Sequence, residues 1–155
     1  MTRTLAVIPA RLASSRFPNK PLKMILGIPM IAHCYYRALL CKNVDKLILA
    51  TPDKKIIELS NQLGFQAIMT SDKHERATER ACEVLDILKS DGKLYDNVLL
   101  LQGDEPQINP ETIDQLIKEI TESNNDVINL IHPIENEDLI DTNIVKAIIN
   151  NDKDV

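Results

Sequence analysis

Apolar runs alternate with amphipathic segments along most of the chain. The apolar runs are short, rich in Val, Ile and Leu, and bounded by polar or proline-containing turns, which is typical of buried strands. The run at 97–101 is the most apolar of them, so we expect it near the centre of a sheet. Strands are expected at residues 4–9, 46–50, 65–69, 97–101, 126–131 and 144–149.

The segments between these runs have apolar residues at helical spacing and recognisable ends. Pro29 suits a first helical turn, Asn109 an N-cap, and Gly64 a C-terminal cap. Alternation of strands and helices predicts an α/β fold, in which helices cover both faces of a mostly parallel sheet. Helices are expected at residues 29–42, 53–63, 75–89 and 110–121.

No internal repeat, low-complexity tract or linker interrupts this pattern. We therefore expect residues 1–155 to form a single domain. The polar residues 150–154 look like a turn that leads into a further strand, so the domain is expected to be truncated at its C-terminus. No apolar run approaches the roughly 18 residues that a bilayer span needs, and we expect no membrane partner.

Composition narrows the class of protein. A hydrophobic fraction of 44% with 26% charged residues is ordinary for a globular protein. The three cysteines form no C-x-x-C pair, which predicts buried free thiols in a reducing cytosol and hence a cytoplasmic protein. The net charge of −5 and an aromatic content of 3% argue against nucleic acid as a partner.

Charge is distributed unevenly. No acidic residue precedes Asp45, so the first third of an acidic chain is strongly positive. Its cations Arg11, Arg16, Lys20 and Lys23 follow the first predicted strand, where α/β folds hold phosphate. A solvated surface loop would explain the cations alone about equally well. The small residues and prolines among them favour a shaped phosphate site, although the segment has neither a Walker A nor a G-x-G-x-x-G pattern.

Two further polar segments follow predicted strands. Residues 101–106, LQGDEP, place Asp104 at the ligand-binding edge of the sheet, where a carboxylate can bind Mg²⁺ beside phosphates. By itself this segment is more typical of a solvated turn, and only the basic loop opposite favours the metal. Residues 69–80 include Thr78 and Arg80, which could contact a ligand, but Ser71 or Asp72 capping a helix is the simpler interpretation.

Together, three motifs resemble the 3-deoxy-manno-octulosonate (Kdo) cytidylyltransferases. The P-A-R-x-x-S-x-R-x-P-x-K-P-L pattern spans 9–22, an M-T-x-x-x-H-x-x-G-T-E-R-like pattern spans 69–80, and Q-G-D-E-P spans 102–106. The resemblance covers essentially the whole chain in the family's order. It implies a Rossmann-like, three-layer α/β/α fold of the nucleotide-sugar nucleotidyltransferase type.

The resemblance also implies a reaction and its residues. CTP and Kdo would give CMP-Kdo and pyrophosphate with Mg²⁺, for lipopolysaccharide biosynthesis, and the full-length protein would be a homodimer. The implied catalytic residues are Arg11, Lys20 and Asp104, with Asp104 as the Mg²⁺ ligand. The implied nucleotide-binding residues are Ala10, Arg11, Ser14, Arg16, Lys20, Thr78, Arg80 and Gln102.

The sequence departs from the family pattern in three ways. Ala77 replaces a usual Gly, and Asn19 replaces a Gly before Lys20, which matters if either position needs a positive φ. Family members are also longer, and the missing part would supply most of the sugar pocket and a second metal-binding Asp. We therefore keep two alternatives: another acid sugar as acceptor, such as 8-amino-Kdo or a sialic-acid-like sugar, or an inactive nucleotide-binding fragment.

Overall fold

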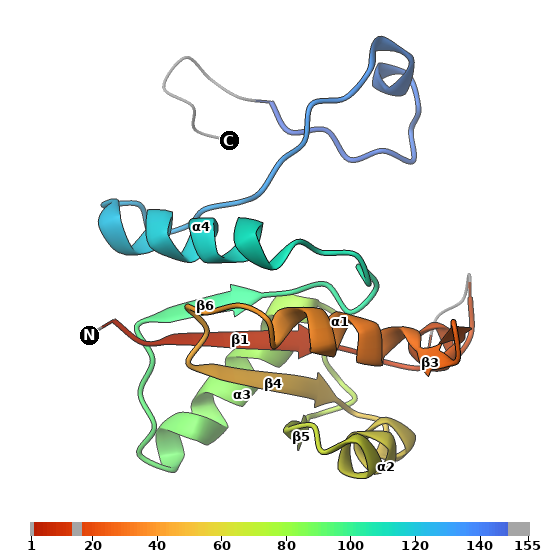
Figure 1. The fold of residues 1–155 in the computed structure, drawn as a ribbon, viewed down its shortest axis with the longest axis vertical. Coiled ribbons are helices and arrows are strands. Elements are labelled where there is room, and N and C mark those ends of the chain that lie inside the picture. Colours follow the sequence, from red (N-terminus) through yellow and green to blue (C-terminus); the bar gives the residue numbers. More distant parts are fainter. Residues whose placement is uncertain (1, 14–16, 149–155) are drawn as a thin grey trace. The chain divides into compact units, whose positions relative to one another are not determined.

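The structure is a computed structural model that describes residues 2–13 and 17–148. The chain divides into two compact units, Met1–Asn124 and Asn125–Val155. The first unit contains a four-stranded sheet in which every neighbouring pair is parallel, in the order β5-β4-β1-β6 (Figure 1). Its strands are β1 (Thr4–Pro9), β4 (Lys46–Thr51), β5 (Ala67–Met69) and β6 (Asn97–Leu100).

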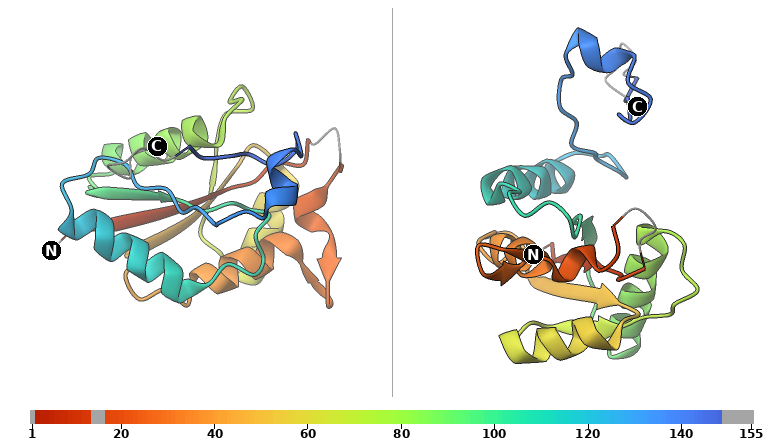
Figure 2. Two further views of the ribbon diagram at one scale, coloured as in Figure 1. Left: turned by 90° about the horizontal axis from the view of Figure 1, so that it is seen from above. Right: turned by 90° about the vertical axis from the view of Figure 1, so that its right-hand side faces the viewer.

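Helices cover both faces of this sheet. In β1, Ala6 and Ile8 belong to one apolar cluster, and Leu5 and Val7 to another, because successive side chains point to opposite faces. The first cluster includes residues of α1, α2 and α4, and the second includes residues of α3. Figure 2 shows α3 on the opposite side of the sheet from α1 and α4. The three-layer prediction is therefore confirmed. The helices are α1 (Met30–Ala38), α2 (Lys54–Leu63), α3 (Ala77–Ser90) and α4 (Pro110–Glu122).

Local sequence explains several helix boundaries. Gly64 follows α2 in the left-handed conformation, with φ of 73°, as expected for a glycine that ends a helix. The side chain of Asn109 accepts a hydrogen bond from the backbone N–H of Glu111, at 3.0 Å, and so caps α4. Both predictions are confirmed. None of the helices among residues 2–13 and 17–148 is long and apolar enough to cross a membrane.

Three expectations about strands were wrong. Within the described residues β6 lies at one end of the sheet order, not at its centre. No strand forms at 126–131 or at 144–148, and residue 149 lies outside the described residues. In the unit Asn125–Val155, Val127 is 75% exposed and Val145 is 94% exposed. An apolar run forms a strand only when a neighbouring strand pairs with it, and among the described residues of this unit there is none. The single domain over 1–155 stays a prediction.

A hairpin separates β1 from α1. Its strands β2 (Met24–Ile25) and β3 (Ile28–Pro29) are antiparallel, and the turn residues Leu26 and Gly27 both have positive φ, at 49° and 83°. The short 3₁₀ helix η1 (Lys20–Leu22) precedes it. These elements bring the chain from the end of β1 to the start of α1.

The loop after β6 passes close to the end of β1. A Cβ atom on Gly103 would lie only 2.7 Å from the carbonyl oxygen of Pro9 and 3.2 Å from the side chain of Ile31. Because the backbone carbonyl cannot move aside cheaply, this position requires glycine on steric grounds. The contact brings the loops that follow β1 and β6 together.

We expect Gly103→Ala to lower the free energy of unfolding by about 1–3 kcal/mol, because the added methyl group overpacks the contact with Pro9. Chemical denaturation followed by circular dichroism measures this. The adjacent exposed residue serves as control, and Gln102→Ala should leave the stability nearly unchanged. Equal stability of Gly103→Ala and the unsubstituted chain would contradict the steric explanation.

Candidate nucleotide-binding site

Two loops at the C-terminal edge of the sheet form the candidate site. The parallel ladder extends beyond both strands, since Ala10 N–H donates to Ala50 O and Leu101 N–H donates to Val7 O, each at 2.9 Å. The backbone N–H of Leu12 then donates to the carboxylate of Asp53 at 2.8 Å. These bonds hold the starts of both loops against the rigid sheet, at the edge where parallel sheets bind ligands.

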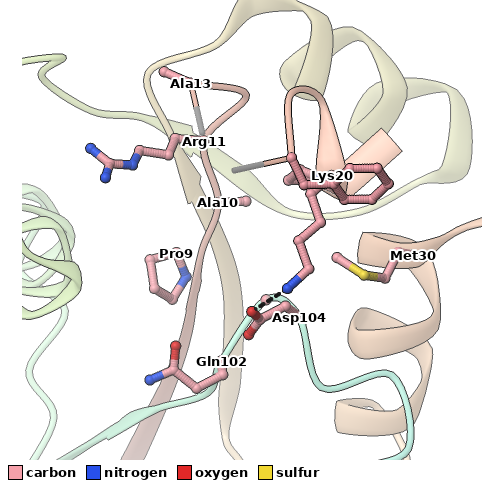
Figure 3. A pocket seen from close by; sticks show the side chains of 11 residues that line it. Pro9, Ala10, Arg11, Ala13, Lys20, Met30, Gln102 and Asp104 are labelled. Carbon is pink, nitrogen blue, oxygen red and sulfur yellow. Dashed lines mark hydrogen bonds and ion pairs between the residues drawn. The ribbon is translucent and has the colours of Figure 1, made fainter. Parts of the chain in front are cut away.

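Between the two loops lies a cleft of about 840 Å³. Figure 3 shows Arg11 and Lys20 from the loop after β1, with Gln102 and Asp104 from the loop after β6. Arg11 points away from the Lys20–Asp104 pair, so the cations lie on different sides of the β1 end. The cleft is lined by Pro9, Ala10, Arg11, Ala13, Phe17, Lys20, Pro21, Met30, Gln102, Gly103 and Asp104.

Lys20 and Asp104 form an ion pair across the cleft. The Lys20 Nζ and Asp104 Oδ2 atoms are 2.6 Å apart, and the side chains are 38% and 50% exposed. Asn19 positions Lys20 from a left-handed conformation, with φ of 57°, which asparagine tolerates better than most residues. An exposed pair of this kind contributes little to stability. Its importance is that it brings the predicted basic loop and the predicted carboxylate together.

A smaller cavity of about 200 Å³ adjoins the cleft. It shares Pro9, Ala10, Arg11 and Gln102 with the cleft, so the two hollows share one wall. Its other wall comes from the end of the loop after β5 and the start of α3. Those further lining residues are His74, Glu75, Arg76, Ala77 and Arg80.

Arg80 is a buried cation at this wall. The residue is only 3% exposed. Its Nη1 atom donates hydrogen bonds to Thr70 Oγ1 and, at 2.9 Å, to the carbonyl oxygen of Ser71. Burial lowers the pKa of Arg80, and the nearby Arg11 guanidinium lowers it further, whereas Glu83 opposes both. Two neighbouring cations, one of them desolvated, favour an anionic or electron-rich ligand.

Carboxylates of α3 hold the segment that precedes it. Glu83 accepts a hydrogen bond from the backbone N–H of Ser71 at 2.8 Å and pairs with His74 Nε2 at 2.6 Å. Glu79 accepts from the backbone N–H groups of Glu75 and Arg76, at 2.9 and 3.0 Å. Glu79, in the first turn of α3, therefore binds the backbone that precedes this helix. The interpretation that Ser71 or Asp72 caps the helix was wrong.

The structure brings most of the predicted site residues together, but not all. Thr78 is exposed on α3 and is not among the described residues that line either hollow. Ser14 and Arg16 lie outside the described residues. The residues that do line the cleft or the smaller cavity are Ala10, Arg11, Lys20, Arg80, Gln102 and Asp104.

The two substitutions in the family pattern fit the backbone. Among the described residues, positive φ at non-glycine positions occurs only at Asn19 and Leu26. Ala77 therefore needs no glycine conformation and begins α3. Sequence reasoning missed the His74–Glu83 pair, because the charges in this region resembled an ordinary solvated helix. Glu83 follows Arg80 by three residues, a spacing that places both on one helix face and was an available signal.

The three cysteines are free thiols. Cys34 is buried and Cys41 partly buried, and burial raises the pKa of each thiol to about 11. Cys82 is exposed on α3, so the expectation of buried thiols was wrong for that residue. In the described part of the chain, no group of three His, Cys, Asp or Glu side chains is arranged to hold a metal ion. A cation at Asp104 would need further ligands beyond the described side chains.

Comparison with known proteins agrees with this geometry. A family model described as "Cytidylyltransferase" matches residues 5–155. The fold is that of the nucleotidyltransferases, and it is shared with a cytidylyltransferase from Leptospira borgpetersenii at a TM-score of 0.65 and 19% identity over 80% of this chain and 51% of that one. The chain belongs to the cytidylyltransferase family.

Curated relatives named 3-deoxy-manno-octulosonate cytidylyltransferase confirm the resemblance drawn from the motifs. The relative from Thermodesulfovibrio yellowstonii is 42% identical over 95% of this chain and 59% of its own length. The Escherichia coli relative is 37% identical over 99% of this chain and 61% of its own length. The chain thus spans about three fifths of these relatives.

A solved structure is similar over the same region. It is the CMP:2-keto-3-deoxy-manno-octonic acid synthetase complexed with CTP. The TM-score is 0.68 at 38% sequence identity, over 76% of this chain and 46% of that chain. The similarity therefore extends over about three quarters of this chain.

Proposed function

We propose that the chain contains the CTP site of an enzyme that transfers CMP from CTP to the anomeric hydroxyl of Kdo and releases pyrophosphate. The observation that supports this most directly is the cleft, which is lined by Arg11 and Lys20 from one loop and by Gln102 and Asp104 from another, with Lys20 paired to Asp104. The adjoining cavity offers a second, smaller compartment beside Arg80. Membership of the cytidylyltransferase family favours CTP over other anionic ligands.

The two hollows suit the two ends of a nucleotide. The larger cleft, with Arg11 and Lys20, suits the triphosphate, since Arg can bind phosphate with two donors and Lys acts as a point charge. The smaller cavity suits the cytosine ring, for which Arg80, Gln102 and the backbone at Ala10 offer polar groups. Ser14, Arg16 and Thr78 remain predicted contributors to nucleotide binding.

Asp104 is proposed to hold a divalent cation, and Mg²⁺ is the ion that this chemistry suits best. Its carboxylate is half-exposed in the cleft, so phosphate oxygens could complete a coordination shell that the described side chains do not form alone. When bound, the cation would neutralise charge on the triphosphate. Arg11 and Lys20 would orient the phosphates and stabilise negative charge on the departing pyrophosphate, which is mainly a matter of positioning.

The acceptor and the biological setting rest on relatives alone. Kdo is the acceptor implied by the name of the curated relatives. A role in lipopolysaccharide biosynthesis and homodimer formation are proposed from the resemblance of the motifs. An enzyme for another acid sugar, or a module that binds nucleotide without turnover, remains the alternative, since the chain spans only part of those relatives.

We expect the chain to bind CTP in the presence of Mg²⁺ at least tenfold more tightly than UTP or ATP. Polar groups in the smaller cavity should discriminate the base, and one well-placed hydrogen bond is worth about 1.4 kcal/mol, or a factor of about ten. Isothermal titration calorimetry measures the three affinities under the same conditions. Equal affinity for all three nucleotides would contradict the assignment of a cytidine site.

Asp104→Asn should remove the metal dependence of CTP binding, because the neutral amide is a weak ligand for a hard cation. Electron paramagnetic resonance of Mn²⁺, used as a probe, should show at least a tenfold loss of bound cation in the presence of CTP. Glu105→Gln is the matched control, since Glu105 is adjacent and exposed but does not line the cleft. Equal loss in both variants would exclude a specific role for Asp104.

The transfer step can be tested in a hybrid in which this chain replaces the matching part of the Thermodesulfovibrio yellowstonii relative. We expect pyrophosphate release that requires CTP, Mg²⁺ and Kdo together. N-acetylneuraminate in place of Kdo should give little release. Comparable release with either sugar would contradict Kdo as the acceptor, and CTP binding without release would favour the nucleotide-binding module.

A further inference from the structure

The wall of the smaller cavity depends on a carboxylate that does not line it. His74, Glu75 and Arg76 line the cavity from the loop between β5 and α3, and Arg80 lines it from α3. Glu83 lies on α3 behind this loop, with a side chain 30% exposed. Its carboxylate binds the loop at the backbone N–H of Ser71 and at His74 Nε2. Both partners are bonded to the same oxygen, Oε2.

We propose that Glu83 is a positioning residue that sets the nucleobase selectivity of the smaller cavity. It would act by tying Ser71 and His74 to α3, and thereby fixing the direction of the Arg80 guanidinium. The proposal rests on the proposed function, because it assumes that the base of CTP occupies this cavity. It deepens that function by assigning base selectivity to a residue that does not contact the base.

Ser71 links Glu83 to Arg80. Its backbone N–H donates to Glu83, and its carbonyl oxygen accepts from Arg80 Nη1. Thr70, the preceding residue, accepts from the same guanidinium nitrogen through its hydroxyl. The position of Arg80 is therefore determined by a loop segment whose other anchor is the Glu83 carboxylate. Thr70 is also held to the sheet, because its backbone N–H donates to the carbonyl oxygen of Thr51 at 2.9 Å. Without the Glu83 anchor, Ser71 can move, and its carbonyl oxygen, the second acceptor of the guanidinium, moves with it.

The charges around Arg80 support the same role for Glu83 as the hydrogen bonds do. Arg80 is buried and lies near a second cation, Arg11, and both effects disfavour its charged form. Glu83 is the largest of the opposing influences on Arg80. Burial raises the pKa of Glu83, but the backbone N–H of Ser71, the His74 ring and Arg80 together favour the ionised form more strongly, so the pKa is lowered. The Glu83 carboxylate thus anchors the loop and also stabilises the charged form of Arg80.

Nucleobase selectivity depends on how firmly the polar groups of the site are held in place. A site built from polar groups discriminates between cytosine and uracil through donors and acceptors that must face the correct ring atoms. Displacing such a group by about 1 Å can cost a large part of its effect. Triphosphate binding should be insensitive to the same displacement, because Arg11 and Lys20 come from the loop after β1 and Lys20 is paired with Asp104 of the loop after β6.

The test compares three probes on the same chain: CTP, UTP and inorganic triphosphate. We expect Glu83→Ala to weaken CTP binding about tenfold, corresponding to the loss of one charge-assisted hydrogen bond. The ratio of CTP to UTP affinity should fall, while the affinity for inorganic triphosphate stays unchanged. Glu83→Gln retains an acceptor for the Ser71 N–H and should recover part of the ratio. Asp86→Ala, an exposed carboxylate one turn further along α3, is the matched control.

A measurement without ligand tests the anchor itself. Hydrogen exchange at the Ser71 amide should become faster in Glu83→Ala and remain unchanged in Asp86→Ala, because only the first loses the acceptor. Circular dichroism reports whether each variant folds. Should Glu83→Ala not fold, the comparison is made with Glu83→Gln. For that variant we expect a smaller fall in the ratio of CTP to UTP affinity and a smaller increase in hydrogen exchange at the Ser71 amide.

The possible outcomes separate the two proposals. A parallel loss of affinity for CTP, UTP and inorganic triphosphate would indicate general structural damage and overturn the positioning role. Unchanged Ser71 exchange in Glu83→Ala, or an unchanged CTP to UTP ratio in a chain that prefers CTP, would overturn it as well. If the unsubstituted chain shows no preference for CTP over UTP, the proposed function fails and the selectivity role fails with it.

Discussion

The close approach of Gly103 to the carbonyl oxygen of Pro9 is the constraint on which the site depends. With a Cβ atom at 2.7 Å from that oxygen, no other residue would fit without displacing one of the loops. The contact places Gln102 and Asp104 within reach of the basic loop after β1. Parallel strands bring their carboxyl ends to one edge of a sheet, but this packing brings two particular loops together.

The charges of the site are arranged around hollows, not buried in the core. Lys20 and Asp104 remain partly exposed and pair with each other, so neither carries the cost of an unpaired buried charge. Arg80 is the exception, because it is buried and its Nη1 atom donates to a hydroxyl and to a carbonyl oxygen. A nucleotide placed across the two hollows would provide the negative charge beside these cations. The family membership and the geometry therefore both agree with the proposed ligand.

Much of the fold could be predicted because its signals are local. The helix-ending conformation of Gly64 and the capping bond of Asn109 follow from neighbouring residues, and the apolar runs at β1 and β4 are buried on both faces. The apolar run at 97–101 identified a strand but not its place in the sheet, which depends on partners distant in sequence. The runs at 126–131 and 144–148 lack such partners among the described residues and form no strand. Strands were predicted there from apolar composition alone.

By itself, the sequence determined the class of fold, because apolar and amphipathic segments alternate along the chain. It also located the basic loop with Lys20 and the carboxylate Asp104, because each belongs to a contiguous motif after a strand. Only the tertiary structure decided which of these meet. It paired Lys20 with Asp104, left Thr78 exposed, and joined Glu83 to Ser71 and His74. The physical reason is that such contacts depend on how α3 and the loops pack against the sheet, and charge patterns along a helix do not specify that packing.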